Sequence, residues 1–317
     1  MAVNLSDQQR RELMDTIPAP EGDTPLAAQL SLDAKRRIDL AGRRFDRPSQ
    51  TRVITVANQK GGVGKTTSAV NLAAGLALGG LKVLVLDMDP QGNASTALGL
   101  QHQSGTPSSY EALIEGTPLA EVVQQSPGVP GLAGVPATID LAGAEIELVP
   151  LVSRETRLRK AVTTYLEAAG ADRPDYVIID CPPSLGMLTV NAFAAADEVL
   201  LPIQCEYYAL EGVSHLLQAV EMFRQHINPT LRVSTILMTM FDGRTNLSQQ
   251  VVEEVQKHFA DEVLRTKIPR SVRVSEAPSY GQTVMTYDPS CSGALAYLEA
   301  ARELASRGAQ QQLAVAA

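Results

Sequence analysis

The chain has 317 residues, a formal net charge of −8 and a pI near 5.1, and 44% of its residues are hydrophobic. This content can supply the core of one large α/β domain, whereas the acidic balance argues against a protein that coats nucleic acid by bulk charge. Any contact with DNA must therefore come from a local basic patch.

Residues 1–50 differ in composition from the rest and are expected to form an accessory N-terminal tail. They carry eight acidic and eight basic side chains. Ser6 with Gln9 fits a capping box, and Thr24 before Pro25 fits the start of a helix. A partly disordered leader suits the same composition, so short helices and disorder both remain open.

From residue 53 onward, short runs rich in β-branched residues alternate with helical stretches. The predicted strands are residues 53–57, 82–87, 146–150, 176–180, 199–203, 233–239 and 263–269. The clearest helix is predicted over 66–78, which ends at a pair of glycines. The alternation predicts a three-layer α/β fold, with a mostly parallel twisted sheet covered by helices on both faces.

Two further segments have little periodicity. Residues 101–140 are rich in Gly, Pro and Ser and are expected to be irregular, with one short helix near 110–114. We place the main domain at residues 51–306 and expect a flexible C-terminal tail at 307–317.

The strongest motif is the sequence KGGVGKTT, which lies between a predicted buried strand and a predicted helix. Its glycines allow backbone N–H groups to surround phosphate oxygens, Lys65 supplies a positive charge, and Thr66 supplies a hydroxyl for Mg²⁺. The predicted nucleotide-binding residues are Lys60, Gly61, Gly62, Val63, Gly64, Lys65, Thr66 and Thr67. ATP and Mg²⁺ are therefore the expected cofactors.

Three carboxylates follow predicted strands at the edge where open α/β sheets bind ligands. Asp87 and Asp89 come at the end of strand 82–87, and Asp180 ends strand 176–180. A carboxylate in the position of Asp180 is typical of the residue that holds Mg²⁺ in P-loop proteins, usually through water.

The phosphate loop departs from the usual pattern at its start. The pattern has glycine five residues before Gly64, but this chain has Gln59, and a second lysine, Lys60, opens the loop. In this it resembles the deviant Walker A family, which includes ParA/Soj and MinD proteins. The resemblance implies an ATP-dependent sandwich homodimer in which Lys60 reaches the partner's nucleotide. An exposed loop lysine is the alternative for Lys60.

Within that family, the chain resembles ParA/Soj partition ATPases from about Val53 to Ala305. The shared motifs are ANQKGGVGKTT, DMDPQGNAST, AGAEIELVP, DCPPSLG, QCEYYALEG and IPRSVRVSEAPS. The resemblance implies that Lys60, Lys65 and Asp89 act in catalysis, with Asp89 orienting or activating the attacking water. It also implies that Thr66, Asp89 and Asp180 form the metal site.

The same resemblance gives less specific assignments at three other positions. Asp87 supports the magnesium shell and its loop, or is purely structural. Met240 and Pro269 match positions that flank adenine in the family, although hydrophobic residues at strand ends are also common in an ordinary core.

Residues 224–273 reverse the overall charge balance, with eight basic and five acidic side chains. The resemblance places Arg244 and Arg273 where family members touch the DNA backbone without reading sequence. With Arg270 they form the predicted DNA-binding set, and ordinary solvated arginines are the alternative.

Cysteine and hydropathy patterns argue against several other classes. Cys181, Cys205 and Cys291 are far apart and form no C-x-x-C pair, which argues against a disulfide framework, a zinc site or an iron–sulfur cluster. No apolar run reaches the roughly 18 to 20 residues that span a bilayer, and the residues after Ala305 lack a basic amphipathic helix. We expect a cytoplasmic protein without stable membrane association.

The resemblance implies a nucleoid-associated, DNA-partitioning switch. ATP would drive a homodimer that binds nonspecific DNA, and a ParB-type centromere-binding partner would stimulate slow hydrolysis that releases the DNA. Two alternatives remain at this point. One is a positioning ATPase for a protein cargo, and the other is a small-molecule kinase or synthetase, which needs a substrate pocket with convergent polar groups.

Overall fold

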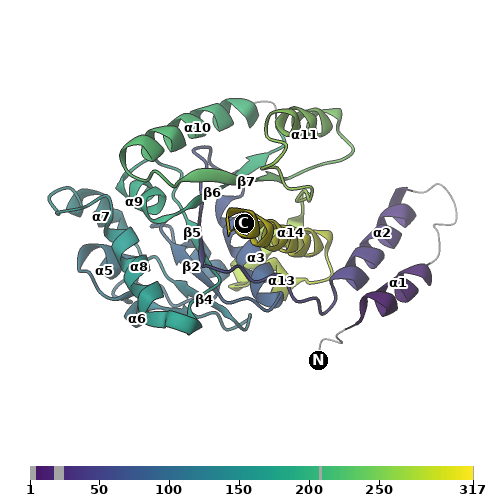
Figure 1. The fold of residues 1–317 in the computed structure, drawn as a ribbon, viewed down its shortest axis with the longest axis horizontal. Helices are drawn as coiled ribbons and strands as arrows, with labels where there is room; N and C mark the ends of the chain where they lie inside the picture. Colours follow the sequence, from purple (N-terminus) through teal and green to yellow (C-terminus); the bar gives the residue numbers. More distant parts are fainter. Residues whose placement is uncertain (1–4, 18–24, 207–208, 317) are drawn as a thin grey trace.

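The computed structural model describes residues 5–17, 25–206 and 209–316. Among these residues, seven strands form one sheet in the order β3-β4-β2-β5-β1-β6-β7 (Figure 1). The strands are β1 (Arg52–Val56), β2 (Val83–Asp87), β3 (Gln124–Gln125), β4 (Leu132–Val135), β5 (Tyr176–Asp180), β6 (Glu198–Gln204) and β7 (Arg232–Thr239). β3 and β4 are antiparallel, and every other neighbouring pair is parallel. The predicted mostly parallel sheet is confirmed.

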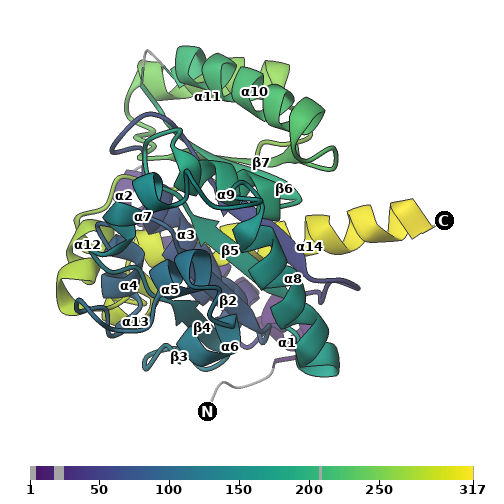
Figure 2. The same ribbon diagram turned by 90° about the vertical axis from the view of Figure 1, so that its left-hand side faces the viewer.

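Helices cover both faces of the sheet, as the alternating pattern predicts (Figures 1 and 2). One face carries α3 (Lys65–Leu78), α4 (Asn93–Ala97), α12 (Val272–Glu276), α13 (Val284–Tyr287) and α14 (Ser292–Ala316). The other carries α5 (Ser109–Ile114), α6 (Leu119–Val122), α7 (Leu141–Glu147), α8 (Arg157–Ala169), α9 (Met187–Ala195), α10 (Ala209–His226) and α11 (Asn246–His258). Short 3-10 turns lie at Gly170–Asp172 and Ala277–Tyr280.

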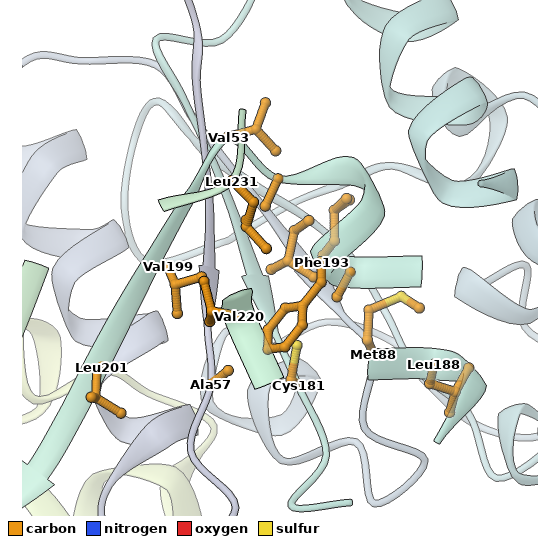
Figure 3. Close-up of a cluster of buried hydrophobic side chains, with 14 of the residues drawn as sticks. Val53, Ala57, Met88, Cys181, Leu188, Phe193, Val199, Leu201, Val220 and Leu231 are labelled. Atoms are coloured by element: carbon orange, nitrogen blue, oxygen red, sulfur yellow. The ribbon is translucent and has the colours of Figure 1, made fainter. Parts of the chain in front are cut away.

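The interior strand β1 shows why the sheet has a core on each side. Successive side chains of a strand point to opposite faces. Val53 accordingly lies in one hydrophobic cluster with Phe193 and Val199 (Figure 3). Ile54 lies in the other cluster, against α3 and α14. A strand buried on both faces reads as a continuous apolar run, which is the signal that the sequence carries.

Two strand predictions are wrong. Residues 146–150 form the end of α7 and the turn after it, and the side chains of Ile146 and Val149 are 78% and 54% exposed. Of the aliphatic side chains in this run, only Leu148 is buried, so the run does not have the buried faces of an interior strand. Residues 263–269 form only isolated bridges, Ile236 with Val263 and Phe241 with Pro269, instead of a full strand beside β7.

The segment 101–140 contains more regular structure than its composition predicts. The expected short helix is present as α5, but α6 and the strands β3 and β4 were not predicted. β4 pairs with β2 and contributes the buried Leu132 and Val135 to the cores. Ala133 and Gly134 lie between these two residues and hide the β-branched pattern of a strand.

The described part of the leader packs on the main domain. It forms α1 (Asp7–Asp15), with the predicted capping box of Ser6 and Gln9, and α2 (Pro25–Leu40). Thr24, the predicted cap of the second helix, lies outside the described residues. Arg36 of α2 pairs with Glu299 of α14, and α1 and α2 lie beside the domain in Figure 1.

The chain after the leader returns to the domain through Phe45. Its side chain is only 8% exposed, and its N–H donates to the Gly79 carbonyl at 2.9 Å. At the other end of the chain, α14 continues to Ala316 and projects beyond the body of the domain (Figure 2). Residues 307–316 are thus helical where a flexible tail is expected, and the division of the chain into three parts stays a prediction.

Candidate nucleotide-binding site

The phosphate loop joins β1 to α3 at the carboxyl edge of the sheet. Gly62 and Gly64 have φ values of 74° and 89°, in the left-handed region that glycine adopts without steric cost. The Thr239 hydroxyl donates to the Val63 carbonyl at 2.8 Å and ties the loop to the end of β7. The backbone is therefore shaped around the start of α3, where free N–H groups favour an anion.

Lys65 lies within this loop. Its side chain is mostly buried, and Nζ donates to the Lys60 carbonyl at 3.2 Å. Burial lowers the pKa of Lys65, while Asp180 and Asp89 act in the opposite direction by stabilising the charged form. Phosphate oxygens near Nζ would replace the single weak carbonyl contact with charged partners.

Asp180 is the most unusual carboxylate of the site. It is fully buried. Among the described residues, its two carboxylate oxygens are the buried polar side-chain atoms that have no hydrogen-bond partner. Burial and the neighbouring Asp87 raise the pKa of Asp180 well above its usual range, against the opposing effects of Thr66 and Lys65. Buried polar atoms in proteins are normally hydrogen-bonded, so these two oxygens are suited to bind a ligand. A carboxylate beside the Thr66 hydroxyl offers the oxygen ligands that Mg²⁺ prefers.

Asp87 shapes the loop that carries Asp89. Its carboxylate accepts the Ser95 N–H at 2.8 Å, the Ser95 hydroxyl at 2.7 Å and the Asp89 N–H at 3.1 Å. Burial raises the pKa of Asp87 to about 6. Both carboxylate oxygens of Asp87 are already hydrogen-bonded within the chain and hold the loop in place. This agrees with the structural alternative for Asp87.

Asp89 is placed beside the phosphate loop. It is 8% exposed, and its Oδ1 accepts the Gln91 N–H at 3.0 Å. Asp87 and Asp180 are register partners in the β2–β5 pair, so the three carboxylates gather at one edge of the sheet. The structure thus brings Asp89, Asp180, Lys65 and the loop together, as the sequence predicts.

Lys60 lies at the mouth of the loop and makes a contact that the sequence did not predict. Its Nζ is 3.0 Å from Glu206 Oε2 of the same chain, and the Lys60 side chain is 41% exposed. Its N–H donates to Asn58 Oδ1 at 3.0 Å, and Asn58 Nδ2 donates to the Pro202 carbonyl at 2.8 Å. Glu206 lies in the QCEYYALEG motif. The motif identifies this segment as similar to the family, but it does not predict the ion pair with Lys60.

Met240 and Pro269 lie on neighbouring segments at the end of β7. The bridge between Phe241 and Pro269 joins the two segments, and the Phe241 N–H donates to the Ile268 carbonyl at 2.9 Å. Met240 has a φ of 51°, a left-handed conformation that costs a non-glycine residue about 1 kcal/mol or more. The strained residue directly follows Thr239, which holds the phosphate loop through Val63.

The predicted DNA-binding arginines form two small groups. Arg244 pairs with Asp242 at 2.7 Å, and its hydrogen bonds lower the pKa of Asp242 to about 2, with a smaller contribution from Arg270. Arg273 pairs with Glu276 at 3.1 Å and with Asp288 at 3.5 Å. All three arginines are exposed.

The basic stretch 224–273 is nevertheless not one patch. Arg224 lies on α10 and pairs with Glu221, and Arg232 lies at the amino end of β7, 3.6 Å from Glu198. The net positive charge of residues 224–273 therefore does not correspond to one surface patch. Arg244 and Arg270 are the two arginines that the fold brings together, because both act on Asp242.

Residues 51–233 match a family model described as an AAA domain. The sporulation initiation inhibitor protein Soj of Bacillus subtilis is 51% identical over 257 residues, which cover 81% of this chain and 99% of the relative. The chromosome partitioning protein ParA of Myxococcus xanthus is 50% identical over 256 residues, which cover 81% and 88%.

Solved structures share the fold. Cobyrinic acid a,c-diamide synthase from Mycobacterium smegmatis, with bound ADP and magnesium, is 37% identical with a TM-score of 0.67, and the match covers 80% of this chain and 93% of that one. The septum site-determining protein MinD of Pyrococcus horikoshii, complexed with Mg-ADP, is 22% identical with a TM-score of 0.62 over 80% and 96%, a likeness of fold alone.

In the described ranges, no helix is both long and apolar enough to cross a membrane. The loop with its two lysines and the orphaned Asp180 fit ATP and Mg²⁺ as cofactors. The fold, this site and relatives matched over nearly their full length all agree. The chain belongs to the ParA/Soj-type family of P-loop ATPases.

Proposed function

We propose that this chain is an ATP-dependent switch that partitions chromosomal or plasmid DNA. ATP binding favours a homodimer, the dimer binds nonspecific DNA in the nucleoid, and a ParB-type partner stimulates the slow hydrolysis that releases it. The proposal rests mainly on Lys60, an exposed second lysine at the mouth of the phosphate loop. Lys65 already points its ammonium group into the loop of its own chain, so Lys60 is available to act on a partner's nucleotide. The names of the Soj and ParA relatives support the partitioning role.

The side chains divide the hydrolytic work. Lys65 and the loop N–H groups hold the phosphates and stabilise the charge that develops on them. Asp89, mostly buried beside the loop, orients the attacking water and accepts its proton. Thr66 and Asp180, together with Asp89, would hold Mg²⁺, which would add positive charge beside the phosphates. Lys60 of one chain acts on the nucleotide of the other, so hydrolysis depends on dimerisation.

DNA binding would use Arg244, Arg270 and Arg273. Arg244 and Arg273 are paired with carboxylates, and phosphate groups of DNA would replace these partners. Contacts of this kind position the backbone without reading bases, and a dimer doubles their number. Binding should therefore require ATP and weaken steeply with salt.

The 37% identity to a cobyrinic acid a,c-diamide synthase favours a second candidate, an ATP-dependent synthetase. A cavity of about 550 Å³ lies between α6 and α8, but its lining includes none of the predicted site residues. The activities are separated by assaying phosphate release together with product analysis. Slow turnover that DNA and a ParB-type protein accelerate, without a modified small molecule, supports partition. Amide or phosphoester formation independent of DNA would reject it.

A third candidate shares the switch but moves a protein cargo. It differs from DNA partition in the role of the exposed arginines. Arg244→Glu with Arg273→Glu should abolish DNA binding if the DNA is gripped as proposed. Unchanged DNA binding by this double variant would favour the cargo interpretation.

A further inference from the structure

The last part of the leader is strongly basic in an otherwise acidic chain. Residues 35–47 contain Lys35, Arg36, Arg37, Arg43, Arg44 and Arg47 against only Asp39 and Asp46. Three of these arginines are ion-paired and attach the leader to itself or to the domain. Arg36 binds Glu299, Arg43 binds Asp39, and Arg47 binds Asp175. In the part of the chain that the structure describes, these pairs leave Lys35, Arg37 and Arg44 without a carboxylate partner.

Arg37 has the most informative position among them. It lies in the last turn of α2, is exposed, and donates to the backbone carbonyl of Ser290, just before α14. Among the described residues, Arg37 forms no ion pair with a carboxylate. Its charge is therefore uncompensated by direct contact.

The turn at residues 288–290 connects Arg37 with the predicted DNA-binding Arg273. Ser290 donates to Asp288 Oδ1 from its N–H at 3.1 Å and from its hydroxyl at 2.6 Å. The other oxygen of Asp288 lies 3.5 Å from Arg273 Nε. Two exposed arginines, one from the leader and one from α12, thus flank the same short turn.

Nearby acidic groups each have another arginine as an ion-pair partner, although Arg36 is shared with Asp33 and Arg273 with Glu276. Asp288 faces Arg273, Glu299 faces Arg36, and Asp39 faces both Arg43 and Arg302. The field around Arg37 is therefore not dominated by an unpaired carboxylate, and an arginine in this setting attracts a phosphate.

We propose that the docked leader extends the DNA-binding surface, with Arg37 contacting a backbone phosphate beside the one held by Arg273. This inference rests on the DNA binding proposed above. The family match begins at residue 51, so this part of the surface lies outside the matched domain. The contact is with phosphate, which makes it independent of base sequence and adds to the salt dependence of binding.

The test uses the full-length protein with ATP and a duplex of arbitrary sequence, and measures the binding constant by fluorescence anisotropy at several salt concentrations. The slope of log K against log salt is negative, and each lost phosphate contact reduces its magnitude by about 0.9, so Arg37→Gln should reduce the magnitude by about 1.8 in a dimer. Arg37→Lys keeps the charge and should stay near wild type. The control is Arg224→Gln, because Arg224 is an exposed arginine on the opposite face of the sheet.

A wild-type slope in Arg37→Gln overturns the inference while leaving the proposed function intact. Equal losses in Arg37→Gln and Arg37→Lys also overturn it, since Arg37 would then only hold the leader through Ser290. If the wild-type protein itself ignores DNA in ATP, the proposed function fails as well.

Discussion

Lys60 is bound to Glu206 of its own chain, with 3.0 Å between Nζ and Oε2. This is the lysine that we propose acts on the partner's nucleotide, so it must leave Glu206 when the dimer forms. An exposed ion pair is worth about 0.2 to 1 kcal/mol. The contact is strong enough to bias the position of Lys60 and weak enough for ATP binding to overcome.

Removing the carboxylate should make dimerisation easier. Glu206→Gln breaks two such pairs per dimer, which corresponds to a dimer Kd about 2- to 30-fold lower in ATP. Analytical ultracentrifugation across a concentration series measures this directly. Asp172→Asn is the matched control, because it removes another exposed carboxylate that pairs with a lysine, Lys82. A weaker dimer in Glu206→Gln would show that Glu206 instead supports the dimer.

The two site residues Lys65 and Asp89 should fail in different ways. Lys65→Ala removes the charge inside the phosphate loop and should abolish ATP binding, and with it DNA binding. Asp89→Ala should still bind ATP but hydrolyse it about 10²- to 10⁴-fold more slowly, because it removes the group that activates water. Nucleotide titration and phosphate release measure the two steps. Normal hydrolysis by Asp89→Ala would assign the water to another group.

Docking of the leader can be tested through Phe45, which packs at the end of α3. The ring is 8% exposed, and a Cβ on Gly79 would collide with it. Phe45→Ala should lower the free energy of unfolding by about 3 kcal/mol, as deletion of a buried aromatic side chain does. Leu30→Ala, at a side chain that is 62% exposed, should change it little. Equal stabilities of the two variants would mean that the leader does not pack on the domain in solution.

A buried ion pair at the amino edge of the sheet predicts how stability depends on pH. Arg52 and Glu198 are both 4% exposed at their side chains and lie 2.6 Å apart. Burial acts to raise the pKa of Glu198, but the hydrogen bond and charge of Arg52 outweigh it, and the net shift is downward from 4.5. A carboxyl whose pKa is lowered by folding adds stability above its ordinary pKa and loses it as the pH falls further.

Glu198→Gln leaves the Arg52 charge buried without its partner and should cost about 3 to 5 kcal/mol near pH 7. The difference from wild type should shrink as the pH falls below 4.5. Chemical denaturation of both proteins at a series of pH values provides the test. A difference that stays constant with pH would contradict an ionised Glu198 in the folded state.

The sequence predicts where the phosphate loop and its carboxylates lie better than it predicts their surroundings. The phosphate loop, Asp89 and Asp180 were found because strand, glycine loop and helix are adjacent in the chain, and local patterns encode such units. The Lys60–Glu206 pair joins residues far apart in sequence, so no local pattern could reveal it. The leader's contact through Arg36 and Glu299 is equally nonlocal.

The wrong predictions about strands and about the basic patch also arise because nonlocal packing is not visible in a local pattern. The run at 146–150 has the composition of a strand, but whether it joins a sheet depends on burial, which tertiary packing decides. The basic stretch 224–273 is continuous in sequence, yet β7 separates Arg232 at its amino end from Arg244 beyond its carboxyl end. Charge along a chain predicts a patch only where the fold places those residues on one surface.

The most direct test of the proposed switch is DNA binding by the purified protein without nucleotide, with ADP and with ATP, at one stated salt concentration. We expect binding to nonspecific duplex only with ATP, loss of that binding in Lys65→Ala, and prolonged binding in Asp89→Ala. An ATP-driven dimer that does not bind DNA, or DNA binding that is indifferent to nucleotide, would contradict the proposed switch.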